Sequence, residues 1–249
     1  SASFNYPREI TTDGTILYVA DNSNHLIRKI VISTGAVTTL AGTGSSGSAN
    51  GTGTSASFNY PRGITTDGTN LYVADTENHL IRQIVISTGV VTTVAGTGSS
   101  GSANGTGTSA SFNYPIGITT DGTNLYVADL SNHLIRKIVI STGAVTTVAG
   151  TGSYGSANGT GTSASFSYPL GITTDGTNLY VADFSNHLIR KIVISTGAVT
   201  TVAGTGSSGS ANGTGTSASF QRPWGITTDG TNLYVTEYLG HLIRKIVIS

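Results

Sequence analysis

The sequence contains no cysteine and no methionine, and charged residues fill only 10% of its 249 positions. Without cysteine the chain forms no disulfide, so its composition does not identify a redox compartment. No apolar run approaches the ~18 residues of a membrane-spanning helix, and we expect a soluble chain without membrane insertion. No targeting segment is visible, which leaves a cytoplasmic and a secreted location equally open.

The net charge is zero, because 12 basic residues balance 12 acidic ones. A general nucleic-acid binder needs a clustered basic excess, so we expect no nucleic acid among the partners. Glycine is abundant, with 34 residues, and Ser, Thr and Asn fill much of the remaining chain. Hydroxyl and amide groups must therefore supply most of the polar surface.

The segment Ser-Ala-Ser-Phe recurs every 54 residues, which makes the chain a tandem array of near-identical units. The last unit is shorter and stops before the segment that reads Thr-Gly-Ala-Val-Thr-Thr-Leu-Ala-Gly in the first unit. We interpret residues 1–249 as a single domain with the repeats 1–54, 55–108, 109–162, 163–216 and 217–249.

Each repeat predicts four short strands and no helix. In the first repeat, turn signals such as Asp13-Gly14 and Thr34-Gly35 separate runs that are rich in β-branched residues. The third run is apolar toward both sides, so neighbouring sheets must cover both faces. Radial packing satisfies this need and predicts an all-β propeller of five four-stranded antiparallel blades, the last without its outer strand. A solenoid is the alternative. The strands expected in the first repeat cover residues 10–12, 17–21, 26–33 and 36–41.

Three motifs of the repeat resemble the NHL-repeat propeller family, which is named for its Asn-His-Leu triplet. They read Pro-x-Gly-Ile, Leu-Tyr-Val-Ala-Asp and Asn-His-Leu-Ile-Arg, and the triplet begins at Asn24 in the first repeat. The last repeat departs from the pattern, with Gly240-His241-Leu242 and with Glu237 in place of Asp. The resemblance implies the propeller fold and leaves the function open, because one fold hosts many functions. Members commonly have six blades, so five is a further departure.

Two arrangements of the chain ends are compatible with five repeats. Either the ring closes by face packing onto a three-stranded fifth blade, or the natural chain is longer. We expect a closed five-bladed ring that is monomeric. The unpaired edge at Leu242–Ile248 also offers a place where another chain can pair.

The repeats differ mainly at positions that the meander brings to one end of the blades. These positions follow the proline of a repeat, occupy the turn before the third strand, or lie in the long inter-repeat segment. We expect that segment to be a mobile loop and the differing side chains to line one rim of the central funnel, polar on one arc and apolar on the other. Neutral drift at tolerant loop tips is one alternative. Another is that Trp224 and Leu170 plug the central channel. The candidate ligand-binding residues are Arg8, Arg62, Ile116, Leu170, Trp224, Asn22, Thr76, Glu77, Leu130, Phe184, Tyr238, Tyr154 and Arg222.

The polar side chains that all repeats share fit structural roles. His25 follows a tight turn away from the axis, where a hydrogen bond with Asp21 explains it better than zinc does. Arg28 fits a tie between blades to a carboxylate or a carbonyl, and Asp13 fits an Asx turn. We therefore predict no catalytic residue, no metal site and no cofactor.

The leading hypothesis is a non-enzymatic scaffold that recognises a peptide or a protein through the variable rim. A glycan is the second candidate ligand, because Trp, Tyr and Asn also suit sugars. A metal-dependent lyase or lactonase, as the resemblance allows, needs ligands that converge at the axis. An engineered or recently amplified propeller without an evolved ligand is also compatible with such similar repeats.

Overall fold

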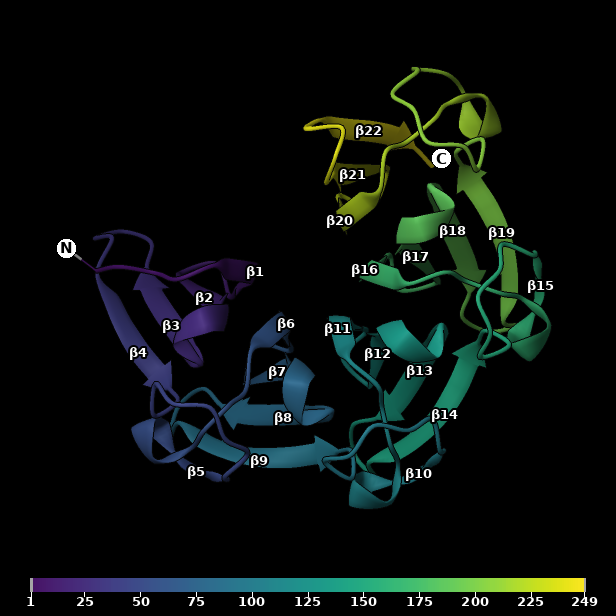
Figure 1. Cartoon of the computed structure of the whole chain (residues 1–249). Helices are drawn as coiled ribbons and strands as arrows, with labels where there is room; N and C mark the ends of the chain where they lie inside the picture. The colour runs from purple at the N-terminus through teal and green to yellow at the C-terminus, as the bar shows by residue number, and fades with distance from the viewer. Residues whose placement is uncertain (1, 249) are drawn as a thin grey trace. The chain divides into compact units, whose positions relative to one another are not determined.

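The computed structural model describes residues 2–248 (Figure 1). Its strands form five antiparallel sheets, one for each repeat, and the expected five-bladed β-propeller is confirmed. The chain forms two compact units, Ser1–Leu125 with Ile138–Val145 and Tyr126–Lys137 with Thr146–Ser249, called unit 1 and unit 2 below. Within residues 2–248 there is no helix with the length and hydropathy that a membrane span requires.

The first sheet has the strand order β1-β2-β3-β4 and follows the expected meander. Asp13 forms the expected Asx turn of the first hairpin, since its Oδ1 accepts the backbone N–H of Thr15 at 2.9 Å and of Ile16 at 2.8 Å. The strands are β1 (Pro7–Thr12), β2 (Ile16–Asp21), β3 (Leu26–Val31) and β4 (Val37–Ala41).

The later sheets repeat this meander, and the last one ends early. Among the described residues the fifth sheet has three strands, so the absence of its outer strand is confirmed. The second sheet contains β6 (Pro61–Thr66), β7 (Asn70–Asp75), β8 (Leu80–Val85) and β9 (Val90–Ala95); the third β11 (Pro115–Thr120), β12 (Asn124–Asp129), β13 (Leu134–Val139) and β14 (Ala144–Ala149); the fourth β16 (Pro169–Thr174), β17 (Asn178–Asp183), β18 (Leu188–Val193) and β19 (Ala198–Ala203); the fifth β20 (Pro223–Thr228), β21 (Asn232–Glu237) and β22 (Ile243–Val247).

The segments between repeats are folded, which corrects the expectation of long loops. The first adds the two-residue strand β5 (Gly51–Thr52) to the outer edge of β9, and β10 (Gly105–Thr106) and β15 (Gly159–Thr160) repeat this on β14 and β19. Phe58, which is fully buried, then bridges Ser46 in parallel. Short 3-10 helices follow the second strand of a blade at η1 (Asn22–Asn24), η3 (Thr76–Asn78), η5 (Leu130–Asn132) and η7 (Phe184–Asn186). Others lie in the segments between repeats at η2 (Gly53–Ser55), η4 (Gly107–Ser109), η6 (Gly161–Ser163) and η8 (Gly215–Ser217).

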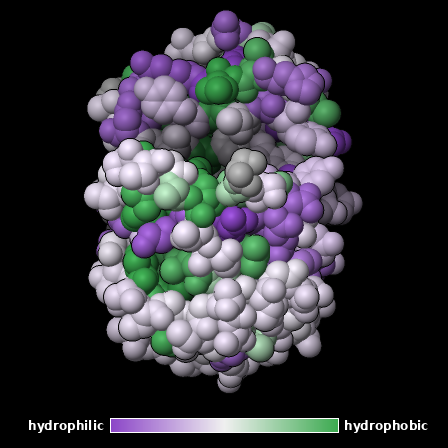
Figure 2. Space-filling model, turned by 90° about the vertical axis from the view of Figure 1, so that its left-hand side faces the viewer, coloured by the Kyte–Doolittle hydropathy of each residue, from purple (hydrophilic) through white to green (hydrophobic). Residues whose placement is uncertain are grey.

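The hydrophobic core lies between neighbouring sheets. In unit 1, Tyr18 and Ile27 of the first sheet pack in one buried cluster with Phe58 and Leu71 of the second repeat. In unit 2, Phe166 and Phe220 occupy the same place in two further clusters. Burying one such side chain contributes about 1.5–3 kcal/mol, so the phenylalanine of Ser-Ala-Ser-Phe stabilises each junction. The surface is less apolar: on the side shown in Figure 2, residues of intermediate hydropathy predominate and hydrophobic patches lie among them.

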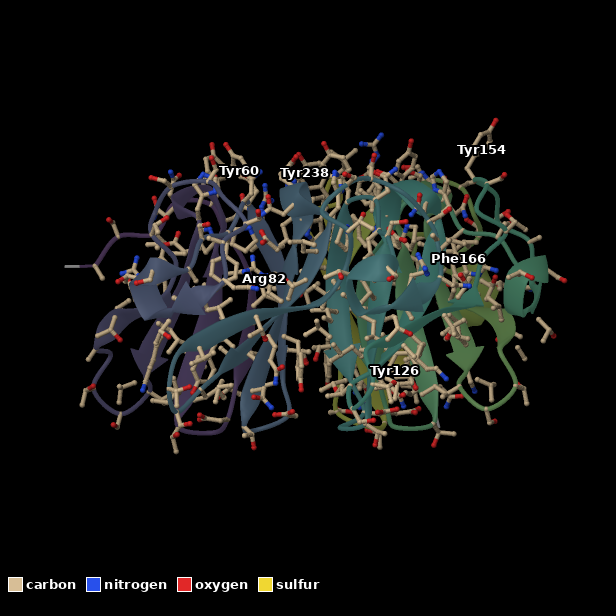
Figure 3. The ribbon with its side chains drawn as sticks, turned by 90° about the horizontal axis from the view of Figure 1, so that it is seen from below. Tyr60, Arg82, Tyr126, Tyr154, Phe166 and Tyr238 are labelled. Carbon is tan, nitrogen blue, oxygen red and sulfur yellow. The ribbon has the colours of Figure 1, made fainter. Side chains whose placement is uncertain are left out.

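A fully buried ion pair explains the arginine that all repeats share. Arg82 Nη1 donates to Asp75 Oδ2 at 2.8 Å, and neither side chain is exposed. Arg82 Nη2 donates to the carbonyl of Ala49 at 3.0 Å and to Asn50 Oδ1 at 2.9 Å, both from the preceding repeat. The expected tie to a carboxylate or carbonyl is confirmed, because the arginine joins both. In Figure 3, Arg82 lies midway between the two ends of its blade.

The Asn-His-Leu triplet has a physical explanation in the second repeat. Asn78 Nδ2 donates to Asp75 Oδ2 at 2.8 Å and to the carbonyl of Gly47 at 2.7 Å. His79 Nδ1 accepts the backbone N–H of Tyr114 in the next repeat at 3.2 Å, and Leu80 is buried. The expected hydrogen bond between this histidine and the aspartate is therefore wrong. Arginine and asparagine already occupy the carboxylate.

Candidate functional site

Three aromatic rings of unit 2, Phe184, Trp224 and Tyr238, pack together and form what we call the aromatic cluster. The ring centroids of Trp224 and Tyr238 are 5.1 Å apart and stacked, and Phe184 meets Trp224 edge-on at 5.7 Å. Tyr238 is 53% exposed, whereas the other two rings are half-buried. Such a group of partly exposed rings presents apolar faces to solvent at one place.

The fold brings these rings together through a contact that earlier repeats make with polar side chains. The residue after the aspartate that ends the second strand, such as Asp21 or Asp75, reaches the start of the inner strand of the next repeat. Asn22 Nδ2 donates a hydrogen bond to the carbonyl of Pro61 at 3.1 Å, and Thr76 Oγ1 donates one to the carbonyl of Pro115 at 2.8 Å. Phe184 holds the same position in the fourth repeat and meets Trp224, which follows Pro223. Aromatic residues at both ends of one contact therefore create the cluster.

Arg222 adds a positive charge beside the aromatic cluster. It is exposed, and its guanidinium carbon lies 5.3 Å from the centroid of the Phe184 ring, within cation–π range. Its backbone N–H donates to His187 Nδ1 at 3.1 Å and its φ is 56°, so the neighbouring repeat holds its main chain in place. Arg222 stands where earlier repeats have tyrosine, such as Tyr168.

The other exposed candidate of unit 2 lies at the same end of its blade. Tyr154 is 80% exposed, and its ring meets His133 at 6.4 Å. In Figure 3, Tyr154 and Tyr238 both lie along the upper edge, whereas Tyr126 lies near the lower one. Tyr154 and Tyr238 thus lie at the same end of unit 2. Leu130 is half-buried.

Unit 1 contains a group of polar side chains that consists of Arg8, Arg62, Glu77 and Tyr114. The charges of Arg8, Glu77 and Tyr114 all influence the pKa of Arg62. Burial lowers the pKa of Arg62, and the positive charge of Arg8 lowers it further, while Glu77 and Tyr114 oppose the shift. A hydrogen bond from the Tyr114 hydroxyl to Glu77 raises the pKa of Tyr114. Sequence reasoning missed Tyr114, although its position before Pro115 matches that of Arg222 before Pro223.

Four of the sequence candidates lie below the surface, which corrects their expected position on an exposed rim. Ile116 and Leu170 are 5% and 4% exposed, and Asn22 and Thr76 are 3% and 0% exposed. Asn22 and Thr76 use their side chains to bind main-chain carbonyls of the next repeat.

No group of three or more His, Cys, Asp or Glu side chains that could hold a metal ion occurs among residues 2–248. Four of the five repeated histidines (His25, His79, His133 and His187) accept main-chain N–H groups of the following repeat.

A family model for the NHL repeat matches residues 58–84, which include β6, β7 and the triplet Asn78-His79-Leu80. The chain is an NHL-repeat β-propeller. This NHL propeller is 32% identical over 269 residues to Protein SUPPRESSOR OF QUENCHING 1, chloroplastic, of Arabidopsis thaliana, a match that covers 100% of the chain and 25% of that protein. It is 29% identical over 282 residues to NHL repeat-containing protein 2 of Homo sapiens, covering 98% of the chain and 39% of that protein. The propeller therefore spans well under half the length of these relatives.

Solved structures share the fold of this NHL propeller at low sequence identity. An auxiliary nutrient binding protein from Bacteroides thetaiotaomicron matches with a TM-score of 0.74 and 17% identity, covering 98% of the propeller and 60% of that chain. A chain of a nidogen/laminin complex matches with a TM-score of 0.70 and 17% identity, covering 98% and 76%. These likenesses support the fold alone.

Proposed function

We propose that this NHL propeller is a non-enzymatic protein-interaction module, and that it binds a peptide segment of its partner at the aromatic cluster with Arg222 beside it. NHL propellers commonly mediate protein interactions, and one structural neighbour comes from a protein complex, that of nidogen and laminin. The observation that supports the site best is the mutual contact of three partly exposed aromatic rings from two successive repeats.

The chemistry of the aromatic cluster suits a peptide that has an apolar side chain and an acceptor group close to it. Trp, Tyr and Arg are the residues most enriched among those that dominate binding energy at protein interfaces. The guanidinium of Arg222 donates to a carboxylate or a main-chain carbonyl, while the stacked Trp224 and Tyr238 rings cover the apolar side chain. Two packed rings lose little conformational freedom on binding, which favours affinity.

The test is selection from a random 12-residue peptide library against the purified protein, with a glycan array in parallel. Selected peptides should bind the double variant Trp224→Ala, Tyr238→Ala at least about tenfold more weakly than the unchanged protein, as expected for interface anchors. The matched control is Tyr6→Ala, which removes a tyrosine that is 70% exposed and lies outside the cluster. This control should leave the affinity unchanged.

Two outcomes contradict the proposal. Selected peptides that bind the double variant as tightly as the unchanged protein show that the cluster is not the site. Glycans that bind in the array, with binding lost in the double variant and no peptide selected, assign the cluster to sugars instead.

A further inference from the structure

Unit 2 carries a second group of rings at its surface, which consists of His133, Tyr154 and Tyr168 and which we call the tyrosine–histidine group. The imidazole of His133 contacts both phenol rings, with ring centroids 6.4 Å from Tyr154 and 4.7 Å from Tyr168, and meets each of them edge-on. Tyr154 is 80% exposed and Tyr168 is 44% exposed, while His133 is half-buried. The group therefore presents two aromatic rings to solvent beside one imidazole.

Main-chain contacts hold the two tyrosines in place. The backbone N–H of Tyr168 donates to His133 Nδ1 at 3.1 Å. Tyr154 bridges Phe166 in parallel, and Phe166 is fully buried. Figure 3 shows Tyr154 above the upper edge of the ribbon and Phe166 within the blade. Rings on a main chain that is already fixed lose little freedom when a ligand binds, which favours affinity.

The polar atoms of the group are available to a ligand. Because His133 Nδ1 accepts a main-chain N–H, the proton of the neutral imidazole is on Nε2, which is therefore a donor. Within residues 2–248, neither this Nε2 nor the hydroxyls of Tyr154 and Tyr168 have a hydrogen-bond partner. A bound molecule can thus pair with one donor and with two hydroxyls that both donate and accept.

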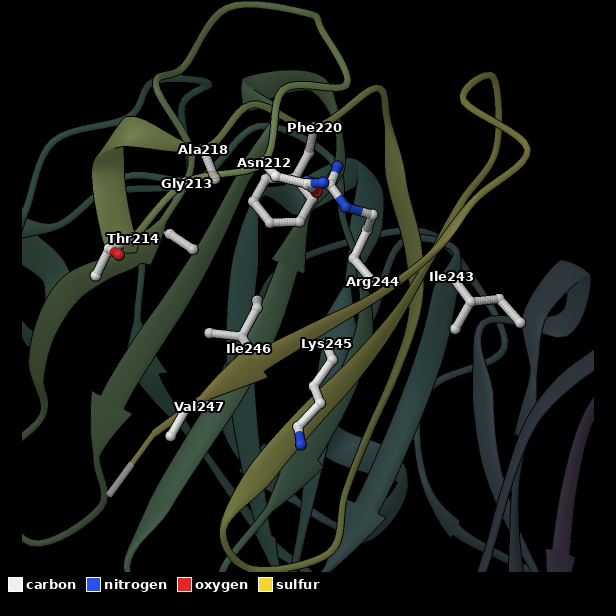
Figure 4. A pocket seen from close by; sticks show the side chains of 12 residues that line it. Asn212, Gly213, Thr214, Ala218, Phe220, Ile243, Arg244, Lys245, Ile246 and Val247 are labelled. Carbon is white, nitrogen blue, oxygen red and sulfur yellow. The ribbon is translucent and has the colours of Figure 1, made fainter.

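The arginine of the cavity beside β22, also in unit 2, illustrates the opposite case. Arg244 donates to Glu237 Oε1 at 2.6 Å and to Asn212 Oδ1 at 3.0 Å. Its guanidinium carbon lies 5.0 Å from the centroid of the Phe220 ring (Figure 4). The fold uses this charged group, whereas it leaves the polar atoms of the tyrosine–histidine group unpaired.

No charged side chain of the described residues shifts the pKa of His133, which burial alone lowers. Two equivalent histidines differ from it. The charge of Glu77 also acts on the pKa of His79, and that of Arg222 acts on the pKa of His187. The surroundings of His133 therefore suit a neutral ligand better than an ionic one.

A pyranose ring has the matching chemistry. One of its faces carries C–H groups, whose partial positive charge is attracted to the negative face of an aromatic ring. Hydroxyls around its edge can pair with the Nε2 donor and with the phenol hydroxyls. An apolar peptide side chain over the same rings would cover these polar atoms without pairing them, which costs free energy.

The other repeats show what Tyr154 adds. Serine stands at the position of Tyr154 in the other three copies of this segment. In the second repeat, His79 accordingly meets a single tyrosine, Tyr114, with ring centroids 5.1 Å apart. The second ring beside His133 is thus a feature of one repeat, and reversing it is a matched change.

We propose that the tyrosine–histidine group is a second binding site of the propeller, which binds a pyranose residue of a neutral oligosaccharide. The apolar face of the sugar stacks on a tyrosine ring, and its hydroxyls pair with His133 Nε2 and with the phenol hydroxyls. The site is separate from the aromatic cluster and does not depend on the function proposed for that cluster.

The test is an array of neutral oligosaccharides built from glucose, galactose, mannose or xylose, followed by calorimetric titration of the strongest binders. At least one should bind with a Kd of about 1 mM or tighter. The variant Tyr154→Ser should weaken this binding by about tenfold, because one of the two aromatic rings is lost. The matched control Tyr6→Ser changes a tyrosine that is 70% exposed outside the group and should bind normally.

Three results would overturn the proposal. One is that no oligosaccharide binds with a Kd of about 1 mM or tighter. The second is equal binding by Tyr154→Ser and the unchanged protein. The third is a library-selected peptide that Tyr154→Ser releases while no sugar binds, which would make a peptide the occupant. Retention of sugar binding by the Trp224→Ala, Tyr238→Ala variant separates this site from the aromatic cluster.

Discussion

The backbone N–H of Tyr60 donates a hydrogen bond to Nδ1 of His25 over a distance of 3.1 Å, and this bond joins two consecutive repeats. The same bond recurs from Tyr114 to His79 and from Tyr168 to His133. A ring nitrogen that accepts a hydrogen bond bears no proton, so these imidazoles are neutral. The histidine of the Asn-His-Leu triplet is thus a link between consecutive repeats.

Acid should weaken these links. Burial lowers the pKa of His25, His79 and His133 below the ordinary value of 6.5. The unfolded chain therefore takes up protons more readily than the folded one, and the stability that the links contribute is complete above about pH 6.5 and is lost as the pH falls through the lower folded pKa. We expect the Tm to fall between pH 7 and pH 5.

The variant His79→Asn separates this effect from other titrations. Asparagine retains an acceptor oxygen and tolerates the left-handed backbone of this position, with φ 55°, but does not titrate. Its Tm should fall less than that of the unchanged protein over the same pH range. Equal falls in differential scanning calorimetry would show that the histidine link does not sense pH.

Removing the buried cation of the second blade should be costly. Arg82→Met leaves the carboxylate of Asp75 buried without its partner, and such a loss typically costs about 3–5 kcal/mol. In Arg28→Met the remaining carboxylate is similarly buried, but the Arg28 side chain is 12% exposed, so water reaches the pair and the cost should be smaller. Urea denaturation monitored by circular dichroism measures both. Equal losses would show that burial of the arginine does not set the cost.

Close packing of the inner strands should exclude a side chain at Gly63. A Cβ at Gly63 would overlap the carbonyl oxygen of Ile116 on the next inner strand, whereas at Gly225 it would lie 3.1 Å from the rotatable hydroxyl of Thr236. Gly63→Ala should therefore destabilise the protein by about 1–3 kcal/mol, and Gly225→Ala by less. Denaturation midpoints that rank the two variants in the opposite order would contradict this packing.

Glu9 should make the first blade less stable in alkaline solution. Desolvation by burial raises the pKa of Glu9 to about 8. The backbone N–H of Ile64 donates a hydrogen bond to Glu9 Oε2 at 3.3 Å, which lowers the pKa but does not offset the effect of burial. The folded state thus favours the protonated acid, and stability is lost as the pH rises from the ordinary value of 4.5 through about 8. The Tm of Glu9→Gln should exceed that of the unchanged protein at pH 9 and approach it at pH 5. A difference that does not change with pH would show that Glu9 is not responsible.

The sequence alone was enough to predict the propeller, its five blades and the absence of the outer strand from the fifth blade. Each repeat contains the same alternation of turn residues and β-branched runs, so every blade could be read in the same way. It was not enough to predict β5 and its equivalents, since a two-residue strand has no periodicity. The partner of His25 was missed because it lies 35 residues away in the next repeat. Asn22 and Ile116 were expected at the surface because variation between repeats does not reveal whether a side chain points outward or between blades.

The central claim is that positions shared by the repeats maintain the fold, while the aromatic cluster and Arg222 bind the partner. Calorimetric titration of a library-selected peptide tests it most directly in a variant whose four site residues become those of the second repeat: Phe184→Thr, Arg222→Tyr, Trp224→Arg and Tyr238→Thr. We predict that affinity falls about 100-fold, as for loss of several interface anchors, while the Tm changes by only a few degrees. Unchanged affinity in this folded variant would contradict the account.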